Sequence, residues 1–416
     1  MTIMNRCALV GLGLAVGLTI PTVAMAADNT IKIGVLATFE GAFAILGDDS
    51  MRGAIMAVDD FGGKIGNKKI EIIKGSSDGT PDSAVRAVRK LVEQDGVKLV
   101  VGPLSGDEGL AVKDYAKTKP DITIVNGTSA AQDTTLRDPA PNFFRFSTDG
   151  AQWMAGLGDY SYNVKHYKRV ATLAEDYSFP YTQVFGFMAP FCKAGGHVVK
   201  KFWVPIGTKD FSSVIAAMPD NIDAIYVVLG GSDSVNFLTQ YKQAGGQAPL
   251  IGGSVTVDQT ILGSKGKIHD VVIGTPSAGP IADDDKAPAW EKFVAEYKKL
   301  PNAFPSPSLF AHGYYVNAMA LLTGLQKVNG DVSDGGVKLR ATLSSLVLET
   351  PTGKVSLDKN RNAIADEFLT EVTAKPDGTL YNKLIKVIPQ VNQTLGIPEA
   401  EFLKLGKVGR DNPSCP

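Results

Sequence analysis

Serine and glycine residues that resemble catalytic motifs occur in this 416-residue chain, but not at catalytic spacings. The string Gly102-Pro-Leu-Ser-Gly106 holds a serine between glycines. A nucleophile elbow reads G-x-S-x-G, so Ser105 stands one position too late for that motif. The string Gly263-Ser-Lys-Gly-Lys267 is too short for a phosphate-binding P-loop and lacks the hydroxyl residue that ends one. The sequence therefore predicts neither a serine nucleophile nor a P-loop.

Metal-ligand patterns are also incomplete. The chain has four histidines without a paired spacing or a cysteine partner, namely His166, His197, His269 and His312. The segment that begins at Asp358 starts like a calcium loop. However, Ala363 stands where that loop needs glycine, and Leu369 stands where it needs glutamate. We expect a turn between strands here, and no catalytic residue, metal ion or cofactor anywhere in the chain.

Small polar residues gather instead after the apolar runs that read as strands. Six such segments are rich in glycine or hydroxyl side chains: Thr38–Gly47, Gly102–Asp107, Asn126–Ala130, Glu175–Tyr181, Gly230–Asp233 and Gly252–Thr256. In open α/β sheets, ligands bind beyond the carboxyl ends of strands, where helix N-termini present unpaired N–H groups. One such loop is ordinary turn chemistry. Six of them in equivalent positions predict a ligand-binding cleft.

The elements around these loops follow one repeated pattern. A short β-branched run is followed by a turn and an amphipathic helix, beginning with a strand at 31–38 and a helix at 48–61. The helix that follows Pro81 has Thr80 or Asp82 as its candidate N-cap. Nearly continuous apolar strands separated by helices indicate a parallel sheet covered on both faces. The same pattern restarts after residue 149 and reaches a last expected strand at 270–279. It predicts an α/β fold with two doubly wound, Rossmann-like lobes.

The last third of the chain departs from this pattern. Residues 287–347 are mainly helical, and the strands after them alternate as antiparallel pairs with a Pro-Asp-Gly turn. Helices without a sheet of their own must complete an existing lobe, so the chain must cross between the lobes several times. We therefore assign 27–148 and 277–347 to the N-terminal lobe, 149–276 and 348–390 to the C-terminal lobe, and 391–416 to a tail.

The N-terminus carries an export signal. Arg6 precedes an apolar run that ends in Ala24-Met25-Ala26, which predicts a signal peptide cleaved after Ala26 and a periplasmic protein. The apolar run is shorter than the ~20 residues that a membrane-spanning helix needs. Cleavage leaves Cys192 and Cys415, which in an oxidising compartment are either one disulfide or two unpaired thiols.

Composition limits the class of partner. The net charge is −1, with 20% charged and 44% hydrophobic residues. This balance argues against nucleic acid, which requires a basic surface, and favours a small ligand of little charge. We expect a monomer.

Five stretches in this order and spacing resemble one family. They read IKIGVLATFEGAFAILGDDSMRGAIMAVDDFGG, KLVVGPLSG, NGTSAAQDTT before NFFRFS, EDYSFPY, and LDKNRNAIADEFLTEV. Along essentially the whole mature chain, the sequence is similar to the type I periplasmic solute-binding proteins of ABC importers, in the leucine/isoleucine/valine-binding branch. The resemblance implies two lobes joined by three crossovers, hinge closure on a ligand, and delivery to a permease in the inner membrane.

The resemblance also implies a ligand site. Carried over position by position, its residues are Phe43, Leu46, Ser105, Gly106, Thr128, Ser129, Ala130, Tyr177, Phe179, Ser232, Val255 and Phe310. Thr128, Ser129 and Ala130 are the expected donors to a ligand carboxylate. Tyr177 and Phe179 are expected to close over the ligand from the other lobe.

One position departs from the family pattern. Branched-chain amino-acid binders hold the ligand ammonium group with a carboxylate in the loop that here contains Val255. A buried ammonium group without a partner costs several kcal/mol, so Val255 suggests a ligand without an amine. Asp233 or Asp176 remains an alternative partner.

The segment NGTSAAQDTT…NFFRFSTDGAQW also resembles the branch that binds aromatic acids such as benzoates and hydroxycinnamates. Aromatic side chains around the cleft favour a flat ring. We expect an aromatic carboxylate first, a branched-chain or other small amino acid second, and amides or other organic acids after these. A ligand-sensing domain for a membrane receptor would share these cleft features, whereas an exported enzyme would need a catalytic cluster.

Overall fold

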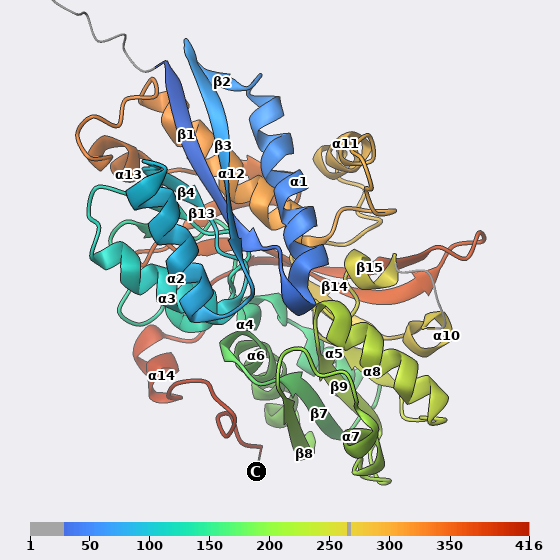
Figure 1. Ribbon diagram of the computed structural model, residues 1–416. Coiled ribbons are helices and arrows are strands. Elements are labelled where there is room, and N and C mark those ends of the chain that lie inside the picture. Colours follow the sequence, from blue (N-terminus) through green and yellow to red (C-terminus); the bar gives the residue numbers. More distant parts are fainter. Residues whose placement is uncertain (1–28, 264–267, 416) are drawn as a thin grey trace, which may run out of the picture.

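The computed structural model describes residues 29–263 and 268–415, and the expected signal peptide at 1–26 lies outside them. The described chain forms two α/β lobes, each built on its own sheet, and Figure 1 shows the lobe with β1 and β3 above the lobe with β7 and β8. Within those ranges, no helix has the length and apolar character required to cross a membrane. The two-lobed α/β fold predicted from the sequence is confirmed.

The sheet of the N-terminal lobe has the strand order β2-β3-β1-β4-β5-β6. All neighbours pair in parallel except β2 with β3. The strands are β1 (Thr30–Thr38), β2 (Lys64–Ile65), β3 (Lys68–Ser77), β4 (Leu99–Val101), β5 (Thr123–Val125) and β6 (Phe143–Phe144). The three residues of β4 and of β5 are all buried, as expected for strands covered on both faces.

Helices cover both faces of this sheet. Those from the first part of the chain are η1 (Gly41–Phe43), α1 (Ala44–Asp60), α2 (Pro81–Arg89), η2 (Lys90–Gln94), α3 (Gly106–Lys117) and η3 (Gln132–Thr134). Those from the later part are α11 (Pro288–Tyr297), α12 (Leu309–Lys327) and α13 (Val337–Ser344). α12 packs along α1, so these late helices lie on the N-terminal lobe.

The second sheet has the strand order β12-β13-β14-β11-β10-β9-β7-β8, and β15 pairs with β14. Its parallel strands are β7 (Arg169–Glu175), β8 (His197–Val204), β9 (Ala224–Val228), β10 (Leu250–Gly252) and β11 (Pro276–Gly279). Its antiparallel strands are β12 (Leu348–Thr350), β13 (Gly353–Leu357), β14 (Ala363–Ala374) and β15 (Leu380–Val391). The predicted antiparallel end of the chain is therefore present.

The helices that accompany the second sheet are mostly short. They are α4 (Gly150–Trp153), α5 (Leu157–Asn163), α6 (Ser178–Lys193), α7 (Ser212–Ala216), α8 (Gly231–Gln243), α9 (Gln259–Leu262) and α10 (His269–Val272). The long helix α6 packs against both α4 and α5.

Two local expectations differ from the structure near residue 277. The apolar run at 270–279 was expected as one strand, but its start forms α10 and only 276–279 form β11. Gly274, with φ of 81°, separates the two. β11 pairs with β10 and β14, so the division expected at 277 cuts through a strand of the second sheet. The return to the N-terminal lobe comes after Gly279.

Helix ends follow the sequence closely. Thr80, not Asp82, is the N-cap of α2, and its hydroxyl accepts a hydrogen bond from the Ser83 N–H at 3.4 Å. Gly62 and Gly63 follow α1 with φ of 64° and 68°. Such left-handed angles favour glycine after a helix.

Arg145 holds together segments that run between the lobes. Its side chain is fully buried and donates to Asn362 Oδ1 at 2.7 Å, to the Ala131 carbonyl at 2.7 Å and to Thr135 Oγ1 at 2.6 Å. Burial lowers the pKa of Arg145 to about 10, against the opposing effect of nearby Asp149. Arg145 therefore remains charged at neutral pH and fixes the first crossover against the start of β14.

The chain ends on the C-terminal lobe. Cys192, on α6, and Cys415 form a disulfide with a Cα–Cα distance of 5.5 Å. The short helix α14 (Glu399–Lys404) precedes this bridge, and its Phe402 ring lies 5.7 Å from the ring of Phe185. The tail is thus attached to α6 at two points.

Candidate functional site

A cavity lies where loops and helix N-termini from both lobes meet. Its walls come from the segments after β1, β4, β5, β7, β9 and β10, together with α4 and α12. Eight of the residues expected from the sequence line it: Phe43, Leu46, Ser105, Thr128, Tyr177, Phe179, Val255 and Phe310. The carboxyl ends of parallel strands bring these residues together, as expected for an open α/β sheet.

Four other expected residues do not line this cavity. Gly106 lies against the other lobe, because a Cβ there would stand 2.7 Å from Ser178 Oγ. The Ser129 side chain points into α3, where a Cβ on Gly109 would stand 1.8 Å from its Oγ. Ala130 is buried behind the cavity, and the Ser232 hydroxyl donates to the Asp233 carboxylate at 3.2 Å.

Three lining residues were not expected from the sequence: Leu104, Trp153 and Gly230. Trp153 ends α4, which begins with a capping box at Asp149. The Trp153 indole N–H donates to Thr148 Oγ1 at 2.9 Å, so its ring is fixed in place. The sequence held a signal for this position. Trp153 directly follows the capping box, in the segment that resembles the aromatic-acid binders.

Aromatic rings form a continuous wall. The Tyr177 ring lies 6.2 Å from the Phe43 ring and 6.1 Å from the Phe179 ring, and Phe179 makes an edge contact with Trp153 at 5.7 Å. These spacings lie in the range at which aromatic pairs attract. A planar apolar group can therefore be enclosed by rings from both lobes.

The aliphatic hydroxyl groups of Ser105 and Thr128, both in the wall, have different roles. Ser105 is the N-cap of α3, where its hydroxyl donates to the Gly79 carbonyl at 3.1 Å and accepts from the Glu108 N–H at 3.5 Å. The Thr128 hydroxyl makes only a long contact of 3.4 Å with the Leu104 carbonyl. Thr128 is thus the hydroxyl that can turn toward a ligand at little cost.

The backbone N–H groups of Thr128 and Ser129 are already engaged. Both donate to the Pro103 carbonyl at 3.2 Å. In this conformation, the Thr128 and Ser129 N–H groups are therefore not available to a ligand, whereas the Thr128 hydroxyl is.

Electrostatics in the cavity come mainly from the backbone. None of the described residues that line it carries a formal charge. The N-termini of α3, α6, α8 and α12 meet here, and their N-cap positions are Ser105, Tyr177, Gly230 and Ser308. Unpaired N–H groups and helix dipoles at such termini attract anions.

The nearby carboxyl groups have partners or are held neutral. Asp176 binds Arg410 and the Tyr181 hydroxyl, and Asp233 accepts from the Gly207 N–H at 2.6 Å. Glu175 lies behind Gly230, whose N–H donates to its Oε1 at 3.0 Å. Burial raises the pKa of Glu175 well above its usual range. Its other oxygen, Oε2, has no hydrogen-bond partner within the described residues.

The lobes are in contact around the cavity. Asp107 of α3 accepts from the Ser178 N–H of α6 at 3.1 Å, and Asp258 accepts from the Leu309 N–H of α12 at 2.8 Å. Each bond places a carboxylate of one lobe at a helix N-terminus of the other. The enclosed volume is about 20 Å³, enough for about one water molecule. A ligand of several heavy atoms therefore needs the lobes or the lining side chains to move apart.

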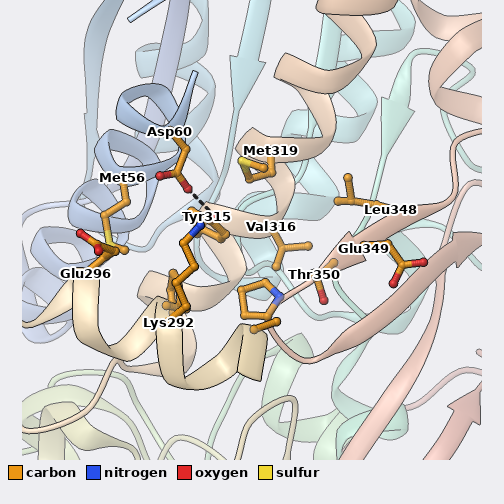
Figure 2. A pocket seen from close by; sticks show the side chains of 13 residues that line it. Met56, Asp60, Lys292, Glu296, Tyr315, Val316, Met319, Leu348, Glu349 and Thr350 are labelled. Carbon is orange, nitrogen blue, oxygen red and sulfur yellow. Dashed lines mark hydrogen bonds between the residues drawn. The ribbon is translucent and has the colours of Figure 1, made fainter. Parts of the chain in front are cut away.

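A larger cavity of about 200 Å³ lies elsewhere, between α1, α11, α12 and β12 (Figure 2). Met56, Val316 and Met319 contribute apolar surface, and Tyr315 donates to Asp60 at 2.6 Å. Its charged lining residues are Asp60, Lys292, Glu296 and Glu349. Three carboxylates against one lysine repel an anion, so this cavity does not suit the carboxylate ligand expected from the sequence.

The similarity to known proteins extends over most of the chain. A family model described as "Periplasmic binding protein" matches residues 30–378. A protein of Brucella melitensis named Leu/Ile/Val-binding protein homolog 6 is 24% identical over 86% of this chain and 91% of its own length.

Two solved structures share the fold. An ABC transporter substrate-binding protein from Sphaerobacter thermophilus is 27% identical, with a TM-score of 0.77 over 88% of this chain and 99% of that one. A solute-binding protein of an ABC transporter from Rhodopseudomonas palustris BisB5, solved with 3,4-dihydroxybenzoic acid, is 26% identical. Its TM-score is 0.80, again over 88% of this chain and 99% of that one.

Proposed function

The chain belongs to the periplasmic binding protein family, and we propose that its interlobe cavity captures a small aromatic carboxylate. Members of this family bind solutes and do not transform them, so the protein is a substrate-binding protein and not an enzyme. In this proposal, the ligand-bound, closed protein acts as a monomer in the periplasm and delivers its ligand to an ABC importer in the inner membrane.

The composition of the cavity wall is the observation that supports this ligand class. Five aromatic side chains line it, namely Phe43, Trp153, Tyr177, Phe179 and Phe310, together with the apolar Leu46, Leu104 and Val255. Such a wall favours a flat ring through burial and ring contacts. The N-termini of α3 and α8 and the Thr128 hydroxyl supply the anion-binding side of the site, whereas Asp107 and Asp258 already occupy the N-termini of α6 and α12.

The surroundings do not favour an amine. Val255, only 5% exposed, occupies the wall at the position where the family's amino-acid binders carry a carboxylate. Asp176 and Asp233 were the alternative partners, but both are engaged in other hydrogen bonds and neither lines the cavity. An ammonium group enclosed here would lose its hydration without gaining an ion pair. The Rhodopseudomonas palustris relative, which holds 3,4-dihydroxybenzoic acid, supports the same ligand class.

A second candidate ligand is a branched-chain amino acid. The Brucella melitensis relative is named for leucine, isoleucine and valine. In this chain, the observation in its favour is Glu175, a buried carboxyl group with one unpaired oxygen behind Gly230. Among the described residues, ionised Glu175 would be an acid near the cavity that is available to an ammonium group, provided that ligand binding compensated for the free-energy cost of ionising it.

The deciding experiment is calorimetric titration of the purified protein with benzoate, 4-hydroxybenzoate, leucine and valine. We expect micromolar or tighter binding of an aromatic acid and weak or no binding of the amino acids. Micromolar binding of leucine or valine, without binding of either benzoate, would overturn the aromatic assignment.

Small-angle scattering tests closure on the same samples. Because the described cavity holds about one water, the lobes must separate to admit a ring. We expect a larger radius of gyration without ligand than at saturation with the acid that binds. Equal radii in the two states would contradict a hinge mechanism.

A further inference from the structure

The end of the chain forms a strap, residues 392–415, along the C-terminal lobe. Figure 1 shows α14 and the chain terminus beside the lobe that contains α6 and β8. Phe402 packs against Phe185 of α6, and the Cys192–Cys415 disulfide fixes the far end of the strap. The segment between these two anchors is therefore held close to the loop that precedes α6.

Arg410 lies between the anchors and pairs with Asp176. The Arg410 Nε donates to Asp176 Oδ1 at 2.7 Å, and a second guanidinium nitrogen contacts Oδ2, so the contact is two-pronged. The Tyr181 hydroxyl also donates to Asp176. Burial raises the pKa of Asp176, but these hydrogen bonds lower it by more, so the pKa lies below its ordinary value. Asp176 is thus a carboxylate whose charge is balanced by the strap.

Asp176 is adjacent in the chain to a residue of the cavity wall. Asp176 directly precedes Tyr177, which is the N-cap of α6 and part of the cavity wall. The Tyr181 ring, one turn into α6, makes an edge contact with Trp203 at 4.8 Å, which fixes the second partner of Asp176. Within the described residues, Arg410 is the only cation that forms an ion pair with Asp176. Without it, Asp176 would place an unbalanced negative charge beside a site that otherwise has no charged lining.

We propose that Arg410 is a specificity-determining residue: by neutralising Asp176, it keeps the cleft favourable to anionic ligands and unfavourable to cationic ones. Arg410 acts through Asp176 and does not touch the ligand. The inference rests on the proposed function in one respect, namely that the preferred ligand is an anion. The strap is the device that delivers the arginine, since Arg410 and Asp176 stand 234 residues apart in the chain.

The test compares two probes of similar size and opposite charge, benzoate and benzylamine, by calorimetry at low salt. In the Arg410→Ala variant, benzoate should bind roughly three- to tenfold more weakly and benzylamine more tightly by a similar factor. High salt should reduce both shifts, because exposed charges are screened. Lys407→Ala is the matched control, since it removes an exposed strap cation that forms no ion pair with Asp176 within the described residues, and it should leave both affinities unchanged.

A double-mutant cycle separates charge from structure. If Arg410 acts by neutralising Asp176, the Arg410→Ala change should have little effect on either probe when Asp176→Asn is also present. Arg410→Lys, which keeps the charge but not the two-pronged geometry, should retain most of the parental preference. Serine at both Cys192 and Cys415, which frees the strap, should shift the preference in the same direction as Arg410→Ala.

The outcomes are distinct from those that test the proposed function. Equal losses for both probes in Arg410→Ala, or an unchanged ratio, would overturn the inference and leave a purely structural contact. Parental preference for leucine over benzoate would overturn the aromatic assignment. Even then, tighter leucine or benzylamine binding by Arg410→Ala would support the role of Arg410, and unchanged binding would refute it.

Discussion

Thr128→Val tests where the ligand carboxylate binds. The change removes one hydroxyl from the cavity wall and keeps the shape of the side chain. In the structure this hydroxyl makes a single long contact, 3.4 Å from the Leu104 carbonyl, so its loss should cost little folding free energy. A hydrogen bond from this hydroxyl to a carboxylate is charge-assisted and contributes ~1.5 to 3 kcal/mol. At ~1.4 kcal/mol per tenfold change, the dissociation constant for benzoate should rise about 10- to 150-fold.

Ser105→Ala is the matched comparison, because Ser105 lines the same cavity with a hydroxyl that is already used. Its oxygen caps α3 and contacts the Gly79 carbonyl, so its removal should lower the free energy of unfolding by ~0.5 to 2 kcal/mol. Benzoate affinity should fall less than in Thr128→Val.

Calorimetry with benzoate and urea unfolding on the parent and both variants separate these effects. Parental benzoate affinity in Thr128→Val, with a large loss in Ser105→Ala, would refute the placement of the carboxylate at Thr128. It would place the carboxylate at the α3 N-terminus instead.

Three further predictions concern acidic groups in and around the cleft. Val255→Glu should weaken benzoate binding at least tenfold through repulsion and desolvation, whereas Val255→Gln, a neutral side chain of the same size, should weaken it less; titration of both variants decides this. Glu175→Gln should change the benzoate affinity of the parent protein by no more than about twofold, because burial already favours the neutral carboxyl group of Glu175. If the ligand is instead an amino acid, the same variant should lose leucine binding. Burial raises the pKa of Asp258 from 3.8 to about 7, so between these values the folded protein keeps a proton that the unfolded chain releases. The free energy of unfolding should therefore fall as pH rises from about 4 to about 7. Asp258→Asn should reduce that fall, measured by urea unfolding at about pH 5 and about pH 8, and an unchanged pH dependence in the variant would contradict this prediction.

Local patterns were enough to predict the fold. Apolar strand runs such as 33–38 and 99–101 are buried on both faces in the structure, and helices follow them as the periodicity indicates. Strand, turn and cap signals depend on residues within a few positions of one another, so they can be read along the chain. The late antiparallel strands were predicted for the same reason. The exception at 270–279 arises because an apolar run of this length fits either a buried strand or a short helix.

The cavity was predicted in outline and not in detail. Loops after parallel strands must meet at one sheet edge, which is why Phe43, Ser105, Thr128 and Val255 lie together in its wall. The direction of a side chain within a loop depends on what packs behind it. Ser129 therefore turned toward α3 and left the cavity, although it stands next to Thr128.

The sequence by itself determined that this is a two-lobed α/β chain whose polar loops share a cleft without a catalytic cluster, because strand periodicity and motif spacing are local properties. Only the tertiary structure decided which acids are free to meet a ligand. Asp176 is indistinguishable along the chain from an available ammonium partner, and its pairing with Arg410 depends on how the tail folds back onto α6. The Cys192–Cys415 pairing and the contact of Asp258 with α12 were decided in the same way. Interactions between residues far apart in the chain depend on the packing of whole elements, and no local pattern records that packing.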